Sequence, residues 1–373
     1  MPPKGFRPGG LEAVDAVVQA GVDGRAFPGG VLAVGRGGAV VHLRAFGRLS
    51  YDADAAPVAT DTIYDLASLT KVVVTTTLSM VLVDEGKLDL DARVQSFLPA
   101  FSGGAKGEVT VRHLLTHSGG LLWWAPLYKE AQGKAAFLER IVALDLDYAP
   151  GTKSVYSDLG IVLLGEILER VSGTGFEELA RRRVIEALAM KDTGYRPAAT
   201  LLPRIAPTEM DPWRGRVVRG EVHDENAFAL GGVAPHAGLF GTAADLANLA
   251  RALLDGGVFA GRRVVSRATV ELFAERAGVP GSSRALGWDT PTDESGLRAS
   301  VAGQPGYSSA GSLLSARSFG HTGFTGTSMW MDPERGLFVV LLTNRVHPTR
   351  ENDRIRDVRS QVADAAVRAL ETP

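Results

Sequence analysis

Two pairs of predicted strands, one near each end of the chain, limit the possible folds more than any other feature of the sequence. Near the start, GGVLAVGRGGAVVHLRAFG contains two apolar stretches, residues 30–36 and 39–46, separated by a glycine pair that suits a hairpin turn. Near the end, TSMWMDPERGLFVVLLTNR contains two more, at about 327–332 and 336–343, joined by a DPERG turn. We therefore expect both ends of the chain to meet in one antiparallel sheet.

Helical patterns accompany these strands. Apolar residues recur at helical spacing over residues 10–23, and RENDRIRDVRSQVADAAVRALE predicts a terminal helix over about 350–371. The middle of the chain is mostly helical, and VTVRHLLTHSGG predicts a short helix that begins after Thr110 and ends at Gly119 or Gly120. Further helices are expected over about 132–143, 158–172, 175–188 and 243–255.

These elements predict a single domain of the α+β class, built from two parts. The sheet and its flanking helices form an α/β part from about 1–66 and 240–373, and about 67–239 form an inserted helical subdomain. Residues 196–240 and 277–320 are rich in Gly, Pro and Ser and show little periodicity. We expect them to be long ordered loops, which in a compact domain usually serve a functional site.

The composition excludes several classes of function. A net charge of −2 offers no basic surface for nucleic acid, and the absence of cysteine excludes disulfides, thiolate nucleophiles and cysteine-ligated metals. No apolar run reaches the roughly 20 residues of a membrane span, and the N-terminus lacks the apolar run of a signal peptide. We expect a soluble cytoplasmic protein without a cofactor; a trimmed leader would instead place it in the periplasm. The oligomeric state does not follow from the sequence.

The stretch DLASLTKVVVTTTLSMVLVDEG places Ser68 and Lys71 three residues apart, at the start of an apolar helix. Positions i and i+3 share one helix face, so the hydroxyl and the amine are neighbours. A lysine in apolar surroundings loses part of its preference for the charged form, so it can accept the proton of a nucleophilic serine. The alternative is a helix-capping serine followed by a surface lysine, because S-x-x-K alone is a weak motif.

Two further motifs favour the nucleophile. Tyr156-Ser157-Asp158 lies where a loop is predicted to enter a helix, and His321-Thr322-Gly323 is predicted to open the penultimate strand. Serine hydrolases of the penicillin-recognising type carry S-x-x-K, then Y-x-N or S-x-N, then K-T-G, in this order. Here the three motifs are SLTK, YSD and HTG, at separations of domain size.

The chain resembles the class C β-lactamase-related serine hydrolases over nearly its whole length. YDLASLTK, EGKLDLDARVQSFLP, VTVRHLLTHSGGL, YAPGTKSVYSDLG, HAGLFGTAADLANLARALL and GHTGFTGTSMWMDPERGLFVVLLTNR read like successive signature blocks of that family. VHDENAFALGGVAPHAGLFGTA is most similar to a branch of penicillin-binding-protein-like carboxypeptidases. The resemblance implies a β-lactamase/transpeptidase-like fold, with an antiparallel sheet flanked by helices beside an all-α subdomain and the site between them.

The resemblance also implies a mechanism. Ser68 would attack a carbonyl group and form an acyl-enzyme, while Lys71 and the phenol of Tyr156 share the general-base and proton-shuttle roles. The backbone amides of Ser68 and Phe324 would form the oxyanion hole. Thr322 and Gly323, in the HTG motif, would line the substrate site.

This sequence departs from the family pattern at two substrate-binding positions. Asp158 replaces an asparagine, and an ionised aspartate only accepts hydrogen bonds, so it would bind a substrate N–H or keep Lys71 protonated. His321 replaces a lysine, and a histidine that is mostly neutral at pH 7 would bind a substrate carboxylate less well. We therefore expect a hydrolase of small esters, amides or peptides, of the esterase, D-amino-acid peptidase or carboxypeptidase type. It would act weakly on β-lactams and prefer substrates without an essential carboxylate; a true β-lactamase is the alternative.

Other interpretations of the sequence remain open. His113 and His117 lie four residues apart on one predicted helix, as metal ligands do, although no third ligand is obvious. A non-catalytic penicillin-binding or sensor module is a further alternative, against which the retained Ser68 and Lys71 argue. A last group of residues would either order loops or line the cleft: His223, His236, Trp123 and Trp124.

Overall fold

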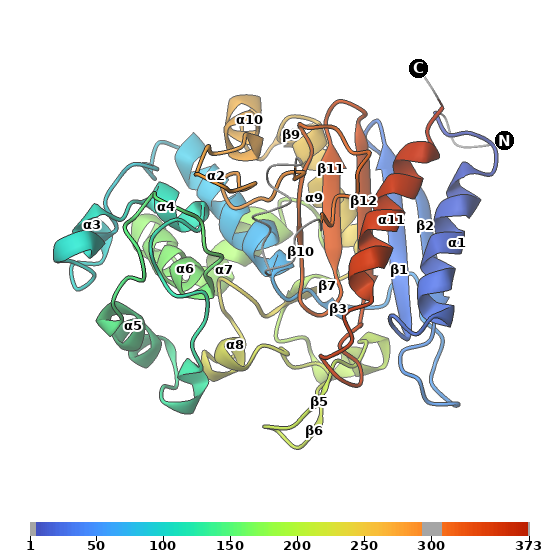
Figure 1. Ribbon diagram of the computed structural model, residues 1–373, viewed down its shortest axis with the longest axis horizontal. Coiled ribbons are helices and arrows are strands. Elements are labelled where there is room, and N and C mark those ends of the chain that lie inside the picture. Colours follow the sequence, from blue (N-terminus) through green and yellow to red (C-terminus); the bar gives the residue numbers. More distant parts are fainter. Residues whose placement is uncertain (1–4, 293–307, 372–373) are drawn as a thin grey trace.

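The computed structural model describes residues 5–292 and 308–371. Its main sheet has five antiparallel strands in the order β10-β11-β12-β1-β2, so strands from both ends of the chain pair at the centre. The strands are β1 (Gly29–Arg36), β2 (Ala39–Gly47), β10 (Phe319–Thr322), β11 (Ser328–Asp332) and β12 (Leu337–Thr343). Figure 1 shows this sheet and the two terminal helices together on one side of the helical half of the molecule. The β-lactamase/transpeptidase-like fold expected from the sequence is confirmed.

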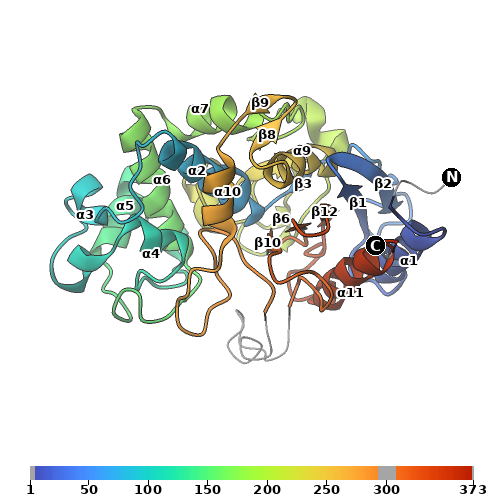
Figure 2. The same cartoon turned by 90° about the horizontal axis from the view of Figure 1, so that it is seen from above.

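Helices cover both faces of the main sheet, as Figure 2 shows from above. Helices α1 (Gly10–Asp23) and α11 (Ile355–Arg368) pack side by side on one face, and α9 (Ala243–Leu254) packs on the other. The side-chain alternation of β1 explains this arrangement. Leu32 and Val34 join the apolar cluster with the terminal helices, whereas Val31 and Ala33 join the larger cluster that continues into the helical half.

The helical half is built around a buried segment that follows the S-x-x-K motif. This segment begins as a π-helix, η1 (Lys71–Thr76), and continues as α2 (Thr77–Asp84), with almost every residue buried. Helix α6 (Asp158–Ser172) packs against it. Around them lie α3 (Val94–Phe97), η2 (Gly104–Glu108), α4 (Val111–Leu115), η3 (Leu127–Lys129), α5 (Lys134–Ala143), α7 (Phe176–Ala180), η4 (Arg181–Ile185) and α10 (Arg267–Ala274).

Short elements connect the two halves. A three-stranded sheet in the order β3-β7-β4 ties the segment before the nucleophile motif to the long loop region. Its strands are β3 (Tyr64–Asp65), β4 (Gly194–Tyr195) and β7 (Leu239–Gly241). The remaining pieces are η5 (Ala199–Arg204), α8 (Glu225–Ala229), and the hairpins β5 (Met210–Asp211) with β6 (Arg216–Val217) and β8 (Val258–Phe259) with β9 (Arg262–Arg263). Within the described residues, no helix is both long and apolar enough to cross a membrane.

The structure confirms the predicted strand pairs and most helices, and it corrects several boundaries. The terminal helix begins at Ile355 rather than near 350, because the preceding segment wraps around Arg345, whose guanidinium donates to the carbonyls of Arg350 and Asn352. The predicted helix over 175–188 divides into α7 and the π-helical η4. Part of the predicted loop 277–320, residues 293–307, lies outside the described residues.

Two motif positions also differ from expectation. The short helix begins after Thr110 as predicted, but it ends at Leu115, and the left-handed residue after it is His117, with φ 53°, not Gly119 or Gly120. His117 is fixed in this conformation because its ring accepts a hydrogen bond from the Ser157 amide. The HTG motif closes the edge strand β10 instead of opening the next strand.

Candidate active site

Ser68 lies in a tight turn between β3 and the π-helical segment. Ala67, directly before it, has a left-handed backbone with φ 47°, a conformation that costs a non-glycine residue about 1–3 kcal/mol. The turn is fixed by side chains: Asp65 accepts the Ala67 amide at 2.8 Å, and the hydroxyls of Thr325 and Thr327 bind the carbonyls of Asp65 and Leu66. Such strain in a fully braced turn is typical of a functional position.

Lys71 is almost completely buried, and its ammonium group contacts three oxygen atoms. It lies 2.9 Å from Ser68 Oγ, 2.7 Å from an Asp158 carboxylate oxygen and 2.9 Å from the His236 carbonyl. Burial acts to lower the pKa of Lys71, but the Asp158 charge acts against it and the pKa is raised overall. Lys71 is therefore an ammonium ion in the resting site, hydrogen-bonded to Ser68 and ion-paired with Asp158.

Tyr156 and Asp158 reach the site from the start of α6. Ser157 caps that helix by accepting the Gly160 amide, so the residues on either side of it are fixed at the helix entrance. The Tyr156 ring centre lies 5.0 Å from the Lys71 nitrogen. Burial raises the pKa of Tyr156 more than Lys71 and Ser68 lower it, so its phenol stays protonated.

The HTG motif forms the opposite wall. Burial holds the pKa of His321 well below its usual value, with Arg284 and Lys71 adding to the effect, so its ring is neutral. Its Nδ1 donates to the Thr322 carbonyl at 2.8 Å. Gly323 follows, and a Cβ at this position would collide with the carbonyl oxygen of Leu66. This glycine therefore lets the strand end approach the turn before the nucleophile.

The backbone amides of Ser68 and Phe324 are both available to a ligand. Within the part of the chain that the structure describes, neither amide donates a hydrogen bond, and both residues line one pocket. The Phe324 peptide is held from behind, because Arg345 Nε donates to the Phe324 carbonyl at 2.7 Å and Arg359 donates to the Gly323 carbonyl at 2.6 Å. Two fixed N–H groups near one serine hydroxyl are the arrangement that an oxyanion hole requires.

The pocket that these residues share has a volume of about 460 Å³ and a strongly basic lining. Its cationic side chains outnumber its carboxylates by five to two. The charged residues of the lining are Arg284, Arg345, Arg350, Arg356 and Arg359, with Asp289 and Asp353.

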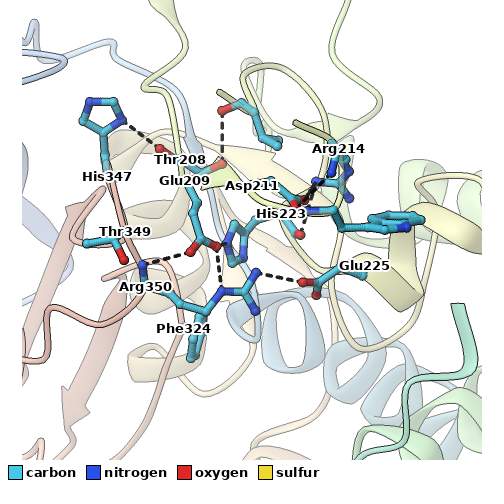
Figure 3. A network of polar contacts seen from close by, with 12 residues as sticks. Thr208, Glu209, Asp211, Arg214, His223, Glu225, Phe324, His347, Thr349 and Arg350 are labelled. Atoms are coloured by element: carbon cyan, nitrogen blue, oxygen red, sulfur yellow. Dashed lines mark hydrogen bonds and ion pairs between the residues drawn. The ribbon is translucent and has the colours of Figure 1, made fainter. Parts of the chain in front are cut away.

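A buried polar network supports Phe324 from the helical side (Figure 3). The His223 ring stacks on Phe324 with centres 5.7 Å apart, and its Nε2 lies 2.8 Å from Glu209, which also accepts Arg350 Nε at 2.6 Å. Burial opposes ionisation of Glu209, but the bonds from His223 and Arg350 outweigh it and lower its pKa to about 2. The His223 amide donates to Asp65 at 2.6 Å, so one network reaches both Phe324 and the turn before Ser68.

The helical histidine pair is occupied by structural contacts. His113 completes a capping box with Thr110, and the His117 ring accepts the Ser157 amide. Across residues 5–292 and 308–371, no group of three or more histidine, aspartate or glutamate side chains is arranged to hold a metal ion. His236 supplies its carbonyl to Lys71, and its ring contacts Asp224 at 3.1 Å.

The tryptophan pair lies at the entrance to α6. The Trp123 side chain is 61% exposed, and its carbonyl accepts the Asp158 amide at 3.0 Å. Trp123 and Trp124 contact each other with ring centres 5.7 Å apart. The lining of the Ser68 pocket includes neither ring among the described residues.

The structure adds residues that the sequence reasoning missed. Glu209, Arg284, Arg345 and Arg359 lie at or behind the pocket, and none belongs to the three motifs. Arg345 follows the end of β12 in LLTNR. A charged residue directly after a buried strand is a sequence signal that could have indicated a site residue. Arg284 comes from a loop without periodicity and had no such signal.

Comparison with known proteins identifies the family of this chain. Residues 14–364 match the Beta-lactamase family. The chain is 31% identical to N-acetylmuramyl-L-alanine amidase of Bacillus subtilis (strain 168), with 90% of this chain and 81% of that protein covered. It is 33% identical to a putative D-alanyl-D-alanine carboxypeptidase of Escherichia coli (strain K12), with 77% and 70% covered. A penicillin-binding protein homologue from Caulobacter crescentus has the same fold, with a TM-score of 0.76 at 23% identity and coverage of 98% and 99%. The chain therefore belongs to the beta-lactamase family of serine hydrolases.

Proposed function

We propose that this protein hydrolyses the amide bonds of small peptide-like substrates through an acyl-enzyme on Ser68, with activity on simple esters and weak activity on β-lactams. The observation that carries the proposal is the position of Lys71, whose nitrogen lies 2.9 Å from Ser68 Oγ and 2.7 Å from Asp158. A serine so placed beside a proton relay is activated for attack on a carbonyl carbon.

Acylation then follows from the charges of the resting site. As Ser68 Oγ bonds to the substrate carbonyl carbon, its proton moves to Lys71 while Lys71 passes one of its own to Asp158. Tyr156, whose phenol burial keeps protonated, gives its proton to the departing nitrogen and regains one from Lys71. Asp158 returns its proton to Lys71, so the site ends in its starting charge state with the acyl group on Ser68. Water then releases the acyl group through the same relay.

The negative oxygen that forms during attack is stabilised by the Ser68 and Phe324 amides. Each such donor typically contributes about 10²–10³ in turnover. The donors are preorganised, because Arg345 and Arg359 hold the carbonyls of Phe324 and Gly323 from behind.

Two considerations favour amides over β-lactams. The relatives that match along most of the chain are named as an amidase and as a putative carboxypeptidase, and both names denote cleavage of an amide bond. In addition, Asp158 is engaged by Lys71 and His321 is neutral, so neither supplies the contact that asparagine or lysine gives in the lactamase pattern.

A labelling and turnover experiment tests the proposal. A fluorophosphonate probe should label the wild type and a control variant, Ser309→Ala, which changes another serine of the same pocket. It should not label Ser68→Ala. The wild type should then cleave N-acetyl-D-alanyl-D-alanine or p-nitrophenyl acetate with a higher kcat/KM than nitrocefin. Faster nitrocefin hydrolysis would identify a true β-lactamase, and an unlabelled wild type would indicate a binding module.

A further inference from the structure

His223 contacts both segments of the chain that carry the oxyanion-hole amides. On one side, its backbone amide donates to one carboxylate oxygen of Asp65 at 2.6 Å, and the other oxygen accepts the amide of Ala67, directly before Ser68. On the other side, its ring lies close to parallel with the Phe324 ring, with 22° between the two planes. His223 is buried, and the lining of the Ser68 pocket, among the described residues, does not include it. It can therefore influence the reaction only through these neighbours.

The ring of His223 is held in one orientation by a charged group that is itself fixed (Figure 3). Its Nε2 lies 2.8 Å from Glu209, whose carboxylate also accepts the backbone amide of Arg350 at 3.1 Å and its Nε at 2.6 Å. Burial opposes ionisation of Glu209, but these hydrogen bonds outweigh it and lower its pKa to about 2. Because an ionised carboxylate only accepts hydrogen bonds, Nε2 of His223 carries the proton and donates it. Arg350 also donates to Glu225 at 2.7 Å, which anchors the network at its far end.

Phe324 depends on such outside support. It lies in the short connection between β10 and β11 and is 47% exposed, so burial in a core does not fix its position. The peptide that carries its N–H begins at Gly323, and a glycine allows more backbone rotation than any other residue. The Phe324 side chain contacts the His223 ring and Arg345, whose guanidinium carbon lies 4.3 Å from the centre of the Phe324 ring. These side-chain contacts add to the backbone hydrogen bonds that hold the peptide.

We propose that His223 is a positioning residue of this hydrolase, which keeps the Phe324 amide in a fixed place relative to the Ser68 amide so that both N–H groups reach the negative oxygen of the transition state. The inference rests on the proposed acyl-enzyme mechanism at Ser68. Donors must lie about 2.7–3.1 Å from that oxygen, and a donor that moves away or tilts loses its effect. Since this charge exists only while the bond forms, loss of His223 should slow acylation and leave substrate binding nearly unchanged.

The test separates acylation from binding. Stopped-flow measurement with p-nitrophenyl acetate gives the acylation rate constant and the dissociation constant of the noncovalent complex. His223→Ala should lower the rate constant by about 10- to 100-fold, below the roughly 10²–10³ that a whole oxyanion donor contributes. It should change the dissociation constant by less than about 3-fold. The inhibition constant of phenylboronic acid, whose tetrahedral serine adduct presents an oxygen to the same amides, should rise by about the factor by which the rate falls.

Two variants serve as internal comparisons. His223→Phe keeps a ring that can stack on Phe324 and should recover part of the lost acylation rate. His347→Ala is the matched control, because His347 is also buried but its ring bonds to the Thr208 carbonyl and stacks on Tyr51 instead of Phe324. It should cost stability as well, yet keep the acylation rate within about 3-fold of the wild type.

A normal acylation rate in folded His223→Ala, an equal loss in His347→Ala, a loss confined to the dissociation constant, or no recovery in His223→Phe would overturn the inference. Thermal melting shows whether each variant folds. If His223→Ala does not, His223→Gln takes its place with the same expected losses, because it retains a donor for Glu209 but no ring. A wild type that shows no acylation at all would be a failure of the proposed function instead.

Discussion

Lys71 and Arg284 are two buried cations on either side of one phenol. The Lys71 nitrogen lies 5.0 Å and the Arg284 guanidinium carbon 5.1 Å from the centre of the Tyr156 ring. Lys71 has three oxygen partners within 2.9 Å, one of them a carboxylate. Among the described residues, the nearest carboxylate oxygen to Arg284 lies 4.0 Å away, and its Nε and Nη1 have no hydrogen-bond partner. The two positions therefore share burial and charge but differ in how completely the protein compensates that charge.

This difference separates the two tasks of the site. The partners of Lys71 all belong to the protein, so Lys71 can exchange protons with them without a contact from the substrate. A cation that lacks partners is stabilised only when the ligand brings one, so it contributes to recognition. We expect variants on the Lys71 side to change the chemical step and variants on the Arg284 side to change the choice of substrate.

Removing the nucleophile should have the largest effect, because it removes the chemistry that both cations serve. Ser68→Ala should reduce turnover by roughly 10⁴-fold or more and abolish covalent labelling. Its melting temperature should stay near that of the wild type, since Ser68 is only half-buried. Intact-mass detection of an acyl adduct on this variant would contradict the assignment.

Removing the proton-transfer groups around Lys71, whose charge the protein compensates, should have the next largest effect. Lys71→Met and Tyr156→Phe should each lower the acylation rate by about 10²–10⁴. The double variant should lose much less than the product of the two, because both groups serve one proton path. Stopped-flow acylation measures these rates, with the exposed Lys153→Met as control. Near-normal rates in both single variants would refute the relay.

Removing the negative charge of Asp158 tests whether this carboxylate compensates the charge of Lys71. Asp158→Asn should lower turnover by about 10²-fold, the lower end for a proton-transfer group. Asp158 raises the pKa of Lys71 against the effect of burial, so without it the pKa of Lys71 falls and the amine forms at lower pH. The active resting site holds Lys71 as an ammonium ion, so the loss of its proton gives the falling limb of the kcat/KM profile, and this limb should move to lower pH. A limb that stays in place or moves to higher pH would show that Asp158 does not hold the Lys71 charge.

Adding a third cation should have the smallest effect. His321→Lys should raise kcat/KM for a carboxylate-bearing substrate by only about 3- to 10-fold, because the new ammonium would lie near the charges of Lys71 and Arg284. The gain should shrink with added salt, since part of it is charge attraction. A gain that is absent or indifferent to salt would mean that His321 does not face the carboxylate.

The fold and the three motifs, SLTK, YSD and HTG, could be recognised in the sequence because their signals are local. The alternating strands, the apolar segment after Lys71 and the cap at Thr110 each depend on neighbouring residues. The end of the short helix could not be predicted, since the left-handed backbone of His117 is fixed by distant residues: Ser157 donates to its ring, and Val155 and Tyr148 donate to its carbonyl. The same applies to Arg284. Nothing near it in the chain shows that it will be buried beside Tyr156.

The contact between the 284–289 loop and β10 also bears on the solubility of the protein. The backbones of Asp289 and Gly320 exchange two hydrogen bonds of 2.9 Å along the outer side of this edge strand. An uncovered edge strand is a template on which a second chain can pair and aggregate. A substitution that loosens the loop backbone, such as Gly287→Val, which would strain φ and collide with Thr76, should therefore appear as self-association on a sizing column. Arg284→Gln leaves that backbone intact and should remain dispersed.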